Sequence, residues 1–63
     1  MKELLSQIVD TFFRLVPRDI ESPEEIASYI YNMCCERGGT NTIKLLTYYG
    51  DNLEKEILNY LNT

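Results

Sequence analysis

The stretch SPEEIASYIYNMCCERG, residues 22–38, decides the fold class of this chain. Ser22 can cap a helix, Pro23 suits the first helical position, and Glu25 stands three residues after the serine, where a capping box places an acid. Apolar residues then recur at helical spacing as far as Gly38, which is well placed to end a helix in a left-handed conformation. We therefore predict a helix that runs from the proline to the residue before the glycine.

Three further segments carry apolar residues at helical spacing, and turn-forming residues separate them. A helix is predicted over residues 2–16, where apolar pairs recur every four residues until Pro17 stops the pattern. A shorter helix is predicted over residues 42–49. A last helix is expected to start at Asp51, where Glu54 completes a second capping box.

These segments predict one domain, residues 1–63, with an all-α fold. We expect a small bundle of four short helices, or of three helices plus a helical turn. A short strand over residues 43–49 is the minor alternative, because tyrosines and leucines cluster there. The first helix is expected to pack along the second and the fourth, while the third closes one end.

The chain is short for a domain that must hide a core. About 60% of the surface of an unfolded chain of this size is buried on folding, so small scaffolds usually need a disulfide, a metal or an oligomer. The only cysteines, Cys34 and Cys35, are adjacent and cannot close a useful loop. With no histidine beside two thiols, we expect no metal site and no cofactor. Self-association or a tight partner is the remaining route to extra stability.

The charge balance limits the classes of partner. Ten acids against six bases give a net charge of -4, which disfavours direct binding to nucleic acid or to an anionic membrane and suits a basic protein surface. No signal peptide pattern and no disulfide framework are visible, so we expect a cytoplasmic protein without a membrane anchor.

No motif carries chemistry. Adjacent cysteines on a helix point about 100 degrees apart, so we expect Cys34 to be buried and Cys35 to lie on the surface. The pair Gly38-Gly39 lacks the following residues of a phosphate-binding loop and is interpreted as a turn between helices. We therefore expect no catalytic residue, no enzyme activity and no small-molecule substrate.

Large apolar side chains are more numerous on the second and third helices than one small core is expected to hold. A helix that is apolar nearly all round contacts another molecule or is buried on most sides. Tyr29 and Tyr60 are expected to cover the edges of the core. The predicted protein-binding residues, which project from faces that do not point inward, are Tyr31, Cys35, Leu45, Tyr48 and Tyr49.

The acids Asp19, Glu21, Glu24 and Glu25 form a secondary candidate contact, although acids near a helix start also complement the helix dipole. The sequence thus predicts a small, acidic, non-catalytic protein-interaction module that acts as an inhibitor, adaptor or regulator and forms a homodimer. The alternative is a DNA-linked transcriptional or anti-defence regulator. It would bind DNA as a dimer through residues 37–44, or imitate DNA with its acidic edge.

Overall fold

The computed structural model describes every residue from Met1 to Thr63 and contains helices and turns only. The elements in chain order are α1 (Lys2–Phe13), α2 (Pro23–Arg37), α3 (Thr40–Tyr49), the 3-10 helix η1 (Gly50–Asn52) and α4 (Leu53–Leu61). The predicted all-α class is confirmed, and the minor alternative of a strand over residues 43–49 is wrong because α3 occupies that segment.

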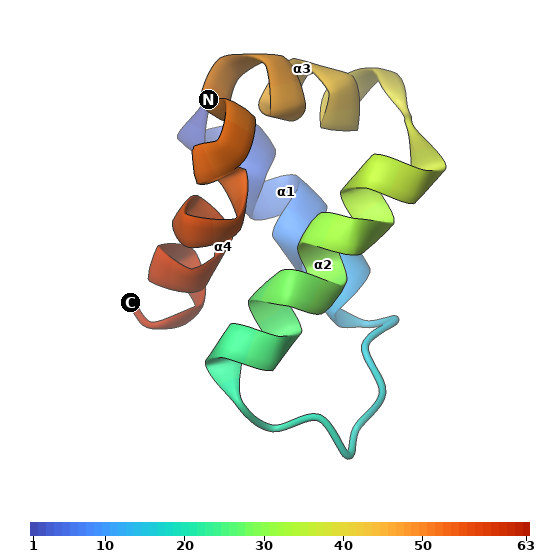
Figure 1. The fold of residues 1–63 in the computed structure, drawn as a ribbon, viewed down its shortest axis with the longest axis vertical. Helices are drawn as coiled ribbons and strands as arrows, with labels where there is room; N and C mark the ends of the chain where they lie inside the picture. Colours follow the sequence, from blue (N-terminus) through green and yellow to red (C-terminus); the bar gives the residue numbers. More distant parts are fainter.

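The last two helices are not separate units, which corrects the prediction of four distinct helices. Residues 40–61 are helical without interruption, so the chain has three continuous helical stretches, the third of which is bent. Gly50 lies at the bend with φ 58° and ψ -134°, a conformation that favours glycine. The bend sends α4 back along the side of α2 (Figure 1). The predicted capping box of Asp51 and Glu54 does not form, because Asp51 lies inside η1 and Asn52 is the N-cap of α4.

Helix α2 has the predicted bounds. Gly38 follows it with φ 62°, and its N–H donates to the carbonyl oxygen of Cys34 at 3.4 Å, so the predicted left-handed end is confirmed. Ser22 is the N-cap, but the predicted capping box is absent. The Ser22 hydroxyl donates instead to the Glu24 carboxylate at 2.7 Å.

Helix α1 ends at Phe13, three residues earlier than predicted. The Leu15 N–H donates to the carbonyl of Phe12 at 2.9 Å, and the Val16 N–H donates to that of Phe13 at 3.2 Å. These shorter-range bonds tighten the chain before Pro17, which disfavours the helical conformation in the residue that precedes it. Leu15 therefore lies outside α1 and is 48% exposed.

The core forms mainly where α4 lies against α2, while α1 packs across both and α3 covers one end (Figure 1). Its eleven apolar members come from every α-helix and are Leu5, Val9, Phe12, Ile26, Ala27, Ile30, Met33, Cys34, Leu45, Leu53 and Ile57. No helix combines the length and the apolar character that crossing a membrane requires.

Tyr29 and Tyr60, which were expected to cover the edges of this core, are each 37% exposed, whereas the tyrosines that pack partly buried against the core are Tyr31 and Tyr49. The Tyr60 hydroxyl is within hydrogen-bond distance of the Ser6 hydroxyl, at 2.9 Å, and donates to the Asp10 carboxylate at 3.3 Å. These two bonds connect the end of α4 to the exposed side of α1.

Two isoleucines provide a matched test of the core. Ile30 has no exposed surface, whereas Ile43 on α3 is 53% exposed. We expect Ile30→Val to lower the free energy of unfolding by about 1 kcal/mol, because a buried methylene is lost. Ile43→Val makes the same chemical change in a helix and should lower it by less than about 0.5 kcal/mol. Urea denaturation followed by circular dichroism measures both, and equal losses would contradict the packing described above.

Candidate functional site: a groove between α2 and α4

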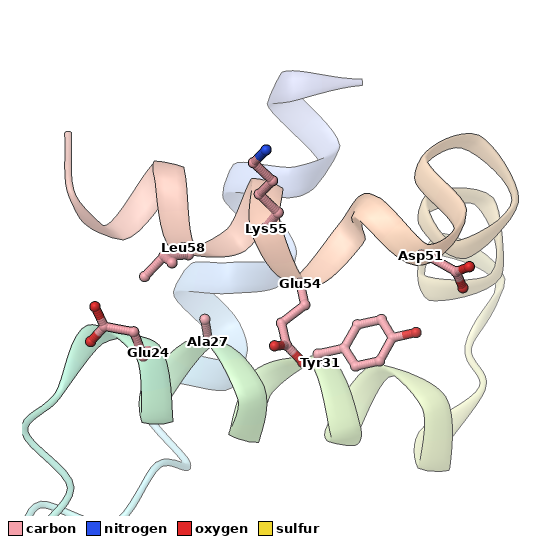
Figure 2. A pocket seen from close by; sticks show the side chains of 7 residues that line it. All are labelled: Glu24, Ala27, Tyr31, Asp51, Glu54, Lys55 and Leu58. Carbon is pink, nitrogen blue, oxygen red and sulfur yellow. The ribbon is translucent and has the colours of Figure 1, made fainter.

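An open groove with a volume of about 350 Å³ lies between α2 and the η1–α4 segment (Figure 2). Its lining residues come from one edge of α2 and from the facing side of η1 and α4, and they are Glu24, Ala27, Tyr31, Asp51, Glu54, Lys55 and Leu58. The three α2 residues follow one another at intervals of three and four, which places them on one side of the helix. The groove is thus a direct product of the packing of α2 on α4.

The side chains divide the groove into an apolar floor and a charged rim. Leu58 lies opposite the start of α2 near Glu24, while Glu54 extends toward α2 beside Tyr31 (Figure 2). Asp51 lies at the other end, on the side of the Tyr31 hydroxyl. Lys55 is the only basic residue of the lining, and its side chain points away from α2.

The rim is negatively charged at neutral pH. The hydrogen bond from Ser22, followed by a backbone N–H, lowers the pKa of the Glu24 carboxyl below its ordinary value. The pKa of the Tyr31 hydroxyl is raised, chiefly because a second negative charge on the neighbouring Cys35 would be unfavourable. Partial burial and the carboxylates of Asp51 and Glu54 raise it further. The groove therefore combines carboxylates with a neutral tyrosine.

The five predicted protein-binding residues differ in exposure. Tyr31 is half-buried in the groove, and Cys35 is exposed one turn further along α2. Tyr48 is 65% exposed on α3, and Tyr49 is half-buried, with the two rings edge to face at 4.9 Å. Leu45 has no exposed surface, so its assignment to a binding surface is corrected: α3 buries the stripe that contains it.

The predicted acidic contact overlaps the groove only in part. All four of its members, Asp19, Glu21, Glu24 and Glu25, are exposed. Of these, only Glu24 lines the groove, because Glu25 lies about 100 degrees further round α2. Sequence reasoning missed Asp51 and Glu54 as members of the site, since it assigned both to a helix cap. One feature of the sequence could have indicated the site: Glu54 and Leu58 are four residues apart, so an acid and an apolar side chain lie side by side on the same edge of α4.

Some of the exposed apolar side chains were not expected to be exposed. Phe13, the last residue of α1, and Leu15, which follows the helix, are each 48% exposed, although the predicted helix over residues 2–16 included both. On α3, Ile43 and Tyr48 remain exposed, as a helix with too many apolar residues predicts.

The two cysteines differ as predicted, with Cys34 buried and Cys35 exposed. Burial, followed by the neighbouring Cys35, raises the pKa of the Cys34 thiol to about 11, so this thiol is unreactive at neutral pH. No three or more cysteine, aspartate and glutamate side chains come together in a group that could hold a metal ion.

Comparison with protein-family models, with curated proteins and with solved structures finds no match to this chain.

The raised pKa of Cys34 predicts a loss of stability at alkaline pH. A thiol that ionises less readily in the folded state than in the unfolded state stabilises the fold. Its contribution to the free energy of unfolding is complete below the unfolded pKa, near 9, and is lost as pH rises toward about 11. We expect the free energy of unfolding to fall over this range by on the order of 2 kcal/mol more in the natural chain than in Cys34→Ala. Urea denaturation at a series of pH values measures this difference. The tyrosines titrate in both proteins, so parallel pH profiles would contradict the burial of Cys34.

Proposed function

We propose that this chain is a non-catalytic protein-binding module of the cytoplasm, an inhibitor, adaptor or regulator that forms a homodimer and whose α2–α4 groove binds a basic segment of a partner protein. The observation that supports this function best is the rim of the groove. Three carboxylates from three different elements, Glu24 of α2, Asp51 of η1 and Glu54 of α4, surround a floor that contains apolar carbon.

A lysine or arginine side chain has two parts that suit this groove. Its aliphatic stem packs on apolar surface such as Ala27 and Leu58, while its charged head reaches the carboxylates. Charge-assisted hydrogen bonds from a guanidinium to a carboxylate are stronger than neutral ones and have a defined geometry. The ring of Tyr31 adds a face on which a guanidinium can stack. A basic segment with alternating small residues is therefore the proposed occupant.

The second candidate function is a DNA-linked regulator. In its mimic form, the same carboxylates would occupy the basic surface of a DNA-binding protein, and the acidic rim favours that form over direct contact with phosphates. In its DNA-binding form, residues 37–44 would reach the groove of the duplex. Arg37 is the first cation of that segment, and its guanidinium lies over the Phe12 ring, 5.8 Å from the centroid, where stacking restrains it.

Single Glu→Gln substitutions, two inside the groove and one outside it, test whether the groove is the binding site. We expect a fluorescent peptide rich in arginine and alanine to bind the natural chain, and fluorescence anisotropy to show roughly tenfold weaker binding for Glu54→Gln and for Glu24→Gln, the loss of about one charged hydrogen bond. Glu25→Gln removes the same charge from the neighbouring position outside the groove and serves as the control.

The salt dependence of peptide binding, together with the Glu25→Gln control, distinguishes a defined site from general electrostatic attraction. Binding to the rim should weaken as salt is raised, because the carboxylates are open to solvent. A loss of affinity in Glu25→Gln as large as that in Glu54→Gln would show that the peptide responds to net charge and would reject the groove as the site.

A further inference from the structure

A second hollow, larger than the groove, lies at the end of α1. Its volume is about 460 Å³, compared with about 350 Å³ for the groove. It is formed by the last residue of α1, the connection to α2 and one residue of α2. We call it the α1-end hollow. The connection that forms most of it projects from the end of the molecule opposite α3 (Figure 1).

The walls of the α1-end hollow are apolar and are already in place in the free chain. Its hydrophobic lining residues are Phe13, Val16, Ile20 and Ile26, and Pro17 adjoins them. Ile26 belongs to the core, and Val16 and Ile20 pack half-buried against it. The Ile20 N–H donates to the carbonyl oxygen of Pro17 at 3.1 Å, which closes a turn in the connection. A ligand would therefore meet a surface that needs little ordering.

The charged side chains that line this hollow are Arg14 and Arg18, so its charge is positive although the chain as a whole is acidic. Both arginines are exposed, and neither takes part in the side-chain hydrogen bonds of the structure. Asp19 and Glu21 belong to the same connection but do not line the hollow. Guanidinium groups donate strong, directed hydrogen bonds to carboxylates. The hollow thus suits a ligand that combines carboxylates with apolar side chains.

The exposed apolar surface favours a peptide segment over the other anions that carry apolar groups. Phe13 lines the hollow and is 48% exposed, and Leu15, which does not line it, is exposed to the same extent. A small amphipathic acid would fill the hollow and leave Leu15 in water, whereas a peptide extends over both. An anionic membrane would meet two arginines on a chain with a net charge of -4, which opposes adsorption.

We propose that the α1-end hollow binds an acidic segment of a partner protein, with apolar side chains of the segment in the hollow and its carboxylates on Arg14 and Arg18. This site goes beyond the proposed function, which places a basic segment in the groove between α2 and α4. The two surfaces attract opposite charges, so they are suited to two different segments at once. Of the three proposed roles, this arrangement matches an adaptor.

Fluorescence anisotropy with a labelled peptide rich in leucine and glutamate tests the charged part of the site. We expect the peptide to bind the natural chain, and Arg14→Gln and Arg18→Gln each to weaken binding by roughly fivefold to tenfold, since each removes a charge-assisted hydrogen bond. Lys44→Gln removes one positive charge from the exposed surface of α3 and serves as the control, with a change below about twofold. A matched peptide with glutamine in place of every glutamate should bind at least about tenfold more weakly.

A second pair of variants tests the apolar part. Phe13→Ser should weaken peptide binding by roughly tenfold, because it removes a side chain that the peptide would cover. Ile43→Ser removes an apolar side chain that is 53% exposed on α3 and should leave binding unchanged. Circular dichroism checks that each variant is folded.

Four results would overturn the proposal. The peptide does not bind the natural chain, or Lys44→Gln weakens binding as much as Arg14→Gln does, which would show a response to net charge alone. Equal binding of the glutamine peptide would reject the role of the arginines. Binding of phosphatidylserine vesicles without binding of the peptide would assign the hollow to an anionic membrane. The arginine-rich peptide proposed for the groove is a separate probe, and its affinity for Arg18→Gln should change by less than about twofold, so each site is judged independently.

Discussion

The packing of α2 against α4 is the contact on which the rest of the structure depends. Ile30 from α2 meets the part of the core to which Leu53 and Ile57 contribute from α4, and none of the three has exposed surface. A chain of this size has few such side chains, so the loss of one contact removes a large share of its stability. The bend at Gly50 makes this packing possible, because it returns α4 along α2 directly after α3.

The same packing creates the groove. Along the edge of this contact, Glu24 lies opposite Leu58, and Glu54 extends toward α2 beside Tyr31 (Figure 2). The early end of α1 leaves Phe13 and Leu15 partly exposed at a different place.

Helix positions could be predicted from the sequence wherever local chemistry determines them. Pro23 and Gly38 gave both ends of α2, and helical spacing separated Cys34 from Cys35. The location of the site could not be predicted in this way. Periodicity shows which residues share a helix face, but not which neighbouring helix covers that face, and Leu45 was therefore assigned to the surface although α3 buries it. Glu54 was interpreted as a cap because its neighbours across the groove are distant in sequence.

Native-state amide hydrogen exchange, read by nuclear magnetic resonance, tests the central role of the α2–α4 contact most directly. Amides in the most stable part of a domain exchange only by global unfolding. We expect the amides of Ile30 and Ile57 to be among the slowest to exchange and to share one free energy of opening, which equals that of global unfolding. Exchange at Ile57 through an opening of α4 that leaves Ile30 protected would contradict it, because α4 would then be an attachment to a core held by the other helices.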